Sequence, residues 1–166
     1  MTFWIVQALG ILSLLFYAIS LQQKSQTKLL AYSIAGDAVF AAQYCFSDTK
    51  TGAIAFIISI AFCLVAALLY NGKKLPLPIL FIFEAIMLGA SVYTWQDYWS
   101  IVPILMSTVH YVRVWYGNVD FSRYAALVLT VGWTVYSIVT GNYGGAVTQG
   151  VIFVAAVVGI VRGKKA

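Results

Sequence analysis

Charged side chains are scarce in this sequence of 166 residues. Only 9% of the residues are Asp, Glu, Lys or Arg, and ten basic residues stand against five acidic ones. Soluble domains carry about 25% charged residues, so the composition excludes an ordinary water-soluble globular domain. The formal net charge of +5 does not indicate a nucleic-acid partner, because the basic residues fall between apolar runs rather than on one face.

The sequence also lacks the residue patterns of common enzymes. It contains no GxxxxGKS, GxxxxGKT, HExxH, GxSxG or CxxC motif. Its single histidine and five carboxylates are scattered along the chain. Cys45 and Cys63 both fall inside apolar runs, where we expect free thiols that serve as small core residues rather than a disulfide. We therefore expect no enzymatic activity, no cofactor and no metal site.

Long apolar segments make up most of the chain. Hydrophobic residues account for 62% of it, and a helical run of about 18 residues or more can cross roughly 30 Å of hydrocarbon. Backbone polar groups in lipid must be bonded within the protein, and unbroken runs of this length favour helices over barrel strands. We predict an all-α integral membrane protein with seven transmembrane helices, at residues 3–21, 29–46, 52–70, 75–93, 99–115, 124–140 and 144–162.

The few charges alternate between the two ends of these predicted helices. Basic residues occur at every second connection and at the end of the sequence, namely Lys24, Lys28, Lys73, Lys74, Arg123, Arg162, Lys164 and Lys165. The intervening connections hold Lys50 with Asp48, and then Asp97. Because basic residues mark the cytoplasmic side of membrane proteins, we expect the amino terminus outside and the carboxyl terminus in the cytoplasm.

The two halves of the chain resemble each other. A shift of 93 or 94 positions aligns residues of the same type, such as Tyr17 with Tyr111 and Gly52 with Gly145. A unit of three spans leaves the membrane on the side opposite its entry, so a parallel second copy requires one extra crossing. We therefore predict two parallel three-helix bundles joined by a linker helix, a kind of repeat used by transporters, with boundaries at 1–72, 73–95 and 96–166.

Four ionisable residues lie within the predicted spans. Asp37 is near the middle of the second span, Glu84 is near the middle of the fourth, and His110 and Arg113 share one face of the fifth. An unpaired charge at mid-bilayer costs about 2.5–3.5 kcal/mol. The two acids either form a structural ion pair or hydrogen bond with Arg113 or His110, or they serve as a substrate contact or proton-linked gate. Glu84 and Arg113 are the candidates for gating or ion pairing, although Arg113 can also extend to the membrane surface.

Aromatic and amide side chains form a second candidate group. Trp133 and Tyr136 are three residues apart in the sixth span, and Gln43 and Gln149 lie in the second and seventh. Aromatic faces with a few amides suit a flat, neutral metabolite such as a sugar ring, and ordinary core packing is the alternative. The predicted substrate site comprises Asp37, Gln43, His110, Trp133, Tyr136 and Gln149.

Several short motifs resemble the YgjV family of bacterial inner membrane proteins. They are Trp4-x-x-Gln7-x-x-Gly10, Gln22-Gln23-Lys24-Ser25, the segment 32–52, Gly141-Asn142-x-Gly144-Gly145 and a basic tail. The resemblance implies a multi-pass protein of the bacterial inner (cytoplasmic) membrane. It implies no particular activity. More distantly, the three-plus-one-plus-three layout looks like that of SWEET sugar transporters and PnuC vitamin transporters. That resemblance implies two three-helix bundles around a central substrate path.

Two functions follow from these observations. The first is a transporter or facilitator that moves a neutral, sugar- or vitamin-like metabolite by alternating access between the two bundles. The second is a non-transporting inner-membrane scaffold or partner protein, in which the polar groups are packed without a continuous cavity. The expected partners are the lipid bilayer and a small-molecule substrate, and formation of a homo-oligomer is left open.

Overall fold

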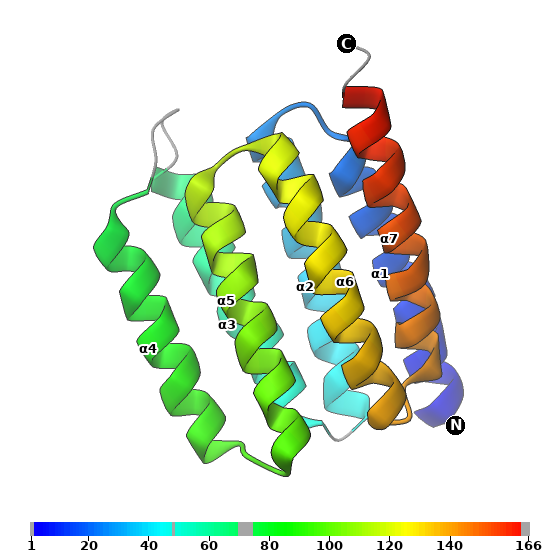
Figure 1. The fold of residues 1–166 in the computed structure, drawn as a ribbon. Coiled ribbons are helices and arrows are strands. Elements are labelled where there is room, and N and C mark those ends of the chain that lie inside the picture. Colours follow the sequence, from blue (N-terminus) through cyan, green and yellow to red (C-terminus); the bar gives the residue numbers. More distant parts are fainter. Residues whose placement is uncertain (1, 48, 70–74, 164–166) are drawn as a thin grey trace.

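The structure, a computed structural model, describes residues 2–47, 49–69 and 75–163. These residues form seven α-helices and one short 3-10 helix (Figure 1). The elements are α1 (Thr2–Gln22), α2 (Gln26–Phe46), α3 (Lys50–Leu69), α4 (Leu77–Tyr93), η1 (Tyr98–Ser100), α5 (Ile101–Tyr116), α6 (Val119–Val139) and α7 (Tyr143–Gly163). The all-helical prediction is confirmed for the described residues. The residues of the charge pattern that lie outside them are Asp48, Lys73, Lys74, Lys164 and Lys165.

Local sequence signals explain where the later helices begin. Pro76 and Pro78 stand at the start of α4, where the missing N–H of proline has no intrahelical partner to lose. The Asn118 side chain caps α6 by accepting hydrogen bonds from the backbone N–H groups of Asp120 and Phe121, at 2.9 and 3.0 Å. The helix therefore begins at Val119. The prediction placed its start at residue 124, because the first turn of α6 is polar and does not belong to the apolar run.

Six of the seven helices stand in two facing rows (Figure 1). The first row is α1, α2 and α3, and the second row is α7, α6 and α5. The rows meet at both edges, because α1 packs on α7 and α3 packs on α5. Helix α4 lies outside the rows and packs against α3 and α5. We call the end with the α1–α2 and α5–α6 connections the basic end, and the opposite end, which holds η1, the Asp97 end.

Four helices are by themselves long and apolar enough to cross a membrane. These are the helical segments Trp4–Gln22, Gln26–Phe46, Lys50–Leu69 and Tyr143–Arg162, while the apolar helix Leu77–Tyr93 is shorter. Large apolar side chains such as Leu68, Val92 and Val147 are exposed on the outside of the bundle, as expected where lipid is the solvent. The described chain is thus an all-α membrane protein, and the crossing by α4, α5 and α6 stays a prediction.

Aromatic rings fill the space between α2, α3 and α6, toward the Asp97 end of the bundle. The ring centroids of Phe56 and Trp133 are 4.6 Å apart, and Tyr44 lies 5.8 Å from Trp133 and 5.7 Å from Tyr136. The hydroxyl groups of Tyr44 and Ser137 are hydrogen-bonded at 3.0 Å. Each such ring pair contributes about 0.5–1.5 kcal/mol beyond its buried area. This aromatic layer, defined as Tyr44, Phe56, Trp133 and Tyr136, therefore holds α2 and α3 against α6.

Small residues let α1 and α7 approach closely at the edge of the bundle. A Cβ atom on Gly10 would lie 2.7 Å from Gln43 Nε2 and 3.3 Å from the backbone carbonyl carbon of Gly144. Across the same contact, Thr148 Oγ1 donates a hydrogen bond to the Gly10 carbonyl oxygen at 2.8 Å. Helices in lipid pack through such small-residue contacts, and this one joins the first row to the second.

We expect Gly10→Ala to destabilise the protein, because the added methyl group must displace Gln43 and press on the α7 backbone. Overpacking of this kind costs about 1–3 kcal/mol, which a lowered Tm in detergent will report. Gly89→Ala in α4 is the matched control, since a Cβ there meets no atom within 4 Å. Equal effects of the two substitutions would contradict the close contact between α1 and α7.

Candidate functional site

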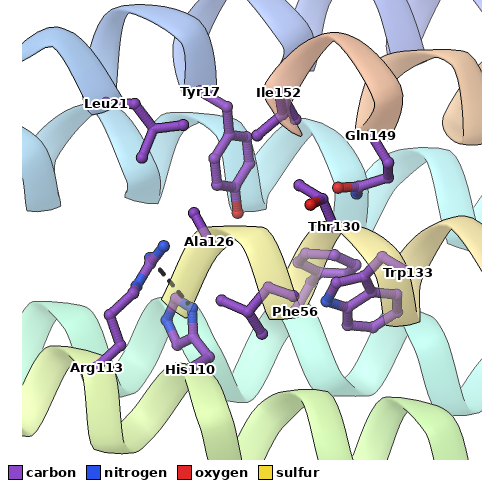
Figure 2. A pocket seen from close by; sticks show the side chains of 11 residues that line it. Tyr17, Leu21, Phe56, His110, Arg113, Ala126, Thr130, Trp133, Gln149 and Ile152 are labelled. Atoms are coloured by element: carbon purple, nitrogen blue, oxygen red, sulfur yellow. Dashed lines mark hydrogen bonds between the residues drawn. The ribbon is translucent and has the colours of Figure 1, made fainter. Parts of the chain in front are cut away.

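A small cavity lies between the two rows of helices (Figure 2). The volume open to the centre of a water molecule is about 30 Å³, which is room for roughly two waters. Helices α1, α3, α5, α6 and α7 all contribute to its wall, so both rows surround it. The residues that line this central cavity are Tyr17, Leu21, Phe56, His110, Arg113, Ala126, Leu129, Thr130, Trp133, Gln149 and Ile152.

Five polar side chains from four helices lie together beside this cavity, in two hydrogen-bonded sets whose ligand atoms on Asp37, Cys63 and His110 are within 4.8 Å of one another. The Tyr17 hydroxyl donates a hydrogen bond to Asp37 Oδ1. Cys63 Sγ lies 3.3 Å from His110 Nε2, and Arg113 Nη2 lies 3.3 Å from His110 Nδ1. We call Tyr17, Asp37, Cys63, His110 and Arg113 the polar cluster. Helix α1 supplies the tyrosine, α2 the aspartate, α3 the cysteine, and α5 the histidine and arginine.

The two neighbours of His110 select one neutral tautomer. A guanidinium group only donates hydrogen bonds, so Nδ1 accepts from Arg113 and carries no proton. The imidazole proton is then on Nε2, where it is donated to the sulfur of Cys63. His110 therefore acts as a hydrogen-bonding bridge between α3 and the guanidinium of Arg113, one helical turn further along α5.

Three residues of the polar cluster are of types that can bind a metal ion. Asp37, Cys63 and His110 each offer one ligand atom, and these atoms lie within 4.8 Å of one another. Carboxylate, thiolate and imidazole together suit zinc. In this arrangement, however, His110 presents a proton rather than a lone pair to Cys63. A metal ion would bind at Nε2 only after Arg113 left Nδ1, so the donors present do not form a ready site.

Two ionisable members of the polar cluster are incompletely bonded within the described residues. Asp37 is 1% exposed and its Oδ2 has no hydrogen-bond partner. Arg113 is 2% exposed and its Nε has none either. The ion pair found in the described part of the chain joins Arg123 to Asp120 at 2.8 Å, and it involves neither of them. A buried carboxyl group and a buried guanidinium thus lie in one cluster beside a cavity, without an ion pair between them.

The cavity brings together several residues that the sequence suggested. His110, Arg113, Trp133 and Gln149 all line it. Asp37 is joined to it through Tyr17, which is a lining residue. The spacing along the chain could not show this grouping, because the residues come from four different helices.

Three other suggested residues lie elsewhere. Tyr136 belongs to the aromatic layer, 5.8 Å from the ring of Trp133. Gln43 Nε2 donates to the Val6 carbonyl oxygen at 2.8 Å and to Asn142 Oδ1 at 3.1 Å, which places it near the Asp97 end. Glu84 is in α4, outside the rows, where it accepts a hydrogen bond from Thr108 at 3.1 Å.

Sequence reasoning missed three hydrogen-bonding members of the site, as well as apolar lining residues such as Phe56. The sequence singles out Tyr17 only as the repeat partner of Tyr111, and Cys63 only as a small core residue. Cys63 is indeed a buried free thiol, whereas Cys45 is exposed rather than in the core. Thr130 was detectable, because the 93-residue shift aligns it with Asp37.

Fold and site together define a multi-helix membrane protein with a buried, mostly apolar cavity that has a polar cluster beside it. Residues 4–166 match the family Imp-YgjV, described as bacterial inner membrane protein, and the chain belongs to that family. The YgjV resemblance and the inner-membrane location expected from it are thereby confirmed. No curated protein and no solved structure matches the chain.

Tyr17→Phe removes the hydroxyl that donates to Asp37, and we expect a lowered Tm in detergent. Leaving a buried acceptor without its partner costs about 1–3 kcal/mol. Tyr124→Phe is the control, because that side chain is exposed on α6. In an Asp37→Asn background the cost of Tyr17→Phe should shrink, and an undiminished cost would argue against the coupling of these two side chains.

Proposed function

We propose that the protein is a small-solute carrier whose binding site is the central cavity. The observation that carries this proposal is a cavity at the interface of the two rows whose wall includes His110, Gln149 and the buried guanidinium of Arg113, which forms no ion pair within the described residues. A purely structural core has no need for unpaired charge, which is costly within a membrane. The aromatic faces of Trp133 and Phe56, together with Gln149 and Thr130, suit the sugar- or vitamin-like ring that the sequence favoured.

The helix contacts support the three-plus-one-plus-three arrangement as part of this proposal. In a parallel repeat, α1 is equivalent to α5, α2 to α6 and α3 to α7. The symmetry then predicts that α5 packs on α3 in the same way as α1 packs on α7. Both contacts are present. Tyr44 and Ser137, which are 93 residues apart and equivalent in the repeat, touch each other. Equivalent residues meet only close to a symmetry axis, so the proposed axis passes between α2 and α6.

Hydrogen bonds tie the two rows together at both ends of the cavity. At the Asp97 end, Gln43 bonds to Asn142 and Tyr44 bonds to Ser137. At the basic end, Arg123 Nε donates to the Leu21 carbonyl oxygen at 3.2 Å. In the carrier proposal this is the closed state, and alternating access opens one end at a time by rocking the rows apart.

The proposal predicts that a solute raises the Tm of the purified protein in detergent. A panel of sugars, nucleosides, vitamins and amino acids is the test, because a ligand of the folded state stabilises it by about 2.7 kcal/mol at 100 times its Kd. The shift should disappear in Trp133→Ala and persist in Val131→Ala, an exposed position on the same helix. A panel without any shift would count against the carrier.

The small size of the cavity favours a second candidate, the non-transporting scaffold or partner protein. Room for roughly two waters and bonds at both ends describe a packed core equally well. The scaffold predicts no solute uptake into proteoliposomes and a stable complex with another inner-membrane protein. The carrier predicts saturable uptake by the reconstituted chain alone, so this assay separates the two.

The orientation in the membrane belongs to the same proposal. With the basic end in the cytoplasm, Lys50→Cys should react with a membrane-impermeant maleimide on intact spheroplasts, and Lys24→Cys should react only after permeabilisation. Both lysines are exposed and lie at opposite ends of the bundle. The background is Cys45→Ser with Cys63→Ala. The reverse labelling pattern would overturn the expected orientation.

A further inference from the structure

We infer that the solute of the central cavity carries a carboxylate group, and that this group binds to the guanidinium of Arg113. The inference rests on the proposed carrier function and names the chemistry of its ligand. Arg113 lines the cavity and is almost fully buried, and its Nε has no partner. Its Nη2 donates a hydrogen bond to Nδ1 of the neutral His110 imidazole, at 3.3 Å. Within the described residues, the positive charge of Arg113 is therefore in place without an anion in contact with it.

A second buried arginine shows how this chain bonds a structural guanidinium. Arg123 donates from Nε to the Leu21 carbonyl oxygen, from Nη2 to the Gln23 carbonyl oxygen, and from Nη1 to Asp120. All three nitrogens have partners, and a carboxylate balances the charge at 2.8 Å. Arg123 joins the two rows at the basic end. Arg113 has no such set of partners, so joining helices does not account for it.

The internal repeat points the same way. At the 94-residue shift that pairs Tyr17 with Tyr111, Arg113 aligns with Ile19 and His110 with Phe16. Apolar side chains thus stand at the equivalent places of the first half. Because the repeated arrangement of helices does not require charge there, the arginine and histidine are a feature of the site rather than of the packing.

The shape of the cavity wall suits a carboxylate attached to a ring or apolar body. Arg113 and His110 lie at one end of the lining, and Phe56 and Trp133 lie at the other, with Thr130 and Gln149 nearby (Figure 2). A guanidinium offers a planar pair of N–H donors that matches the two oxygens of a carboxylate. The aromatic end then packs against the rest of the molecule. The neutral solute expected from sequence gives way to an acid, because only the structure shows Arg113 without an anionic partner.

Asp37 explains how the site tolerates its charge before the solute arrives. Asp37 belongs to the same polar cluster, and in its ionised form it offsets the guanidinium without forming an ion pair with it. The unpartnered Oδ2 of Asp37 can also accept from an ammonium group. Simple carboxylic acids and amino acids both carry the carboxylate that Arg113 requires, and comparing them decides whether an amine contributes. Since the cavity holds only roughly two waters, binding must accompany separation of the rows.

The experiment compares acids with their neutral amides on the purified full chain in detergent. The pairs are acetate with acetamide, benzoate with benzamide, and phenylalanine with phenylalaninamide. We expect at least one acid to raise the Tm with an apparent Kd about 10- to 100-fold lower than that of its amide, the range of a hydrogen bond to a charged group. Arg113→Gln should abolish this preference, and Arg113→Lys should weaken it. Arg162→Gln, an exposed arginine on α7, is the matched control and should leave it unchanged.

The outcomes separate this inference from the carrier proposal. If neutral compounds stabilise the protein as well as acids do, the carrier stands and the carboxylate inference is wrong. If acids are preferred but Arg113→Gln retains the preference, the anion binds elsewhere and the inference is also overturned. If neither these pairs nor the wider panel stabilises the wild-type chain, both proposals fail. If Arg113→Gln does not fold, Arg113→Lys takes its place, and an acid-to-amide ratio that is not weakened in that variant overturns the inference.

Discussion

Hydrocarbon offers no hydrogen-bond partner, and the structure follows from this constraint. Every backbone group within the membrane must be bonded inside the protein, so the chain forms helices and turns apolar side chains such as Leu68 and Val92 outward. The few polar side chains must then find one another in the interior. They do so where helices from both rows converge, in the polar cluster beside the central cavity.

The buried charges are treated differently at the end and in the middle of the bundle. Arg123 at the basic end is bonded through all three of its nitrogens and joins α6 to the end of α1. Arg113 and Asp37 in the middle each keep one unpartnered atom. The fold thus saturates the charge that holds helices together and leaves charge available beside the cavity. In the carrier proposal, this contrast within one chain assigns binding to the middle of the bundle and packing to its end.

Parts of the fold and of the site were open to prediction because their signals are local. Apolar runs predicted one helix each, and the errors fall at ends such as that of α6, where the Asn118 cap precedes the apolar run. Trp133 and Gln149 were selected by residue type and line the cavity, while Gln43, selected on the same grounds, is bonded to Val6 and Asn142 instead. Residue type alone does not show which face of a helix points into the bundle. A site predicted from residue type therefore contains both residues that line the cavity and residues that do not.

The sequence by itself determined the class of protein, the helices and the family, because hydropathy, length and motif are properties of neighbouring residues. Only the tertiary structure decided which polar groups meet. Cys63 and His110 are 47 residues apart and touch because α3 packs on α5 with these faces inward. Glu84, as polar as Asp37 and equally central in its helix, lies outside the rows because α4 does. The rotation and position of each helix depend on side-chain packing across the whole bundle, and a single run of sequence does not contain that information.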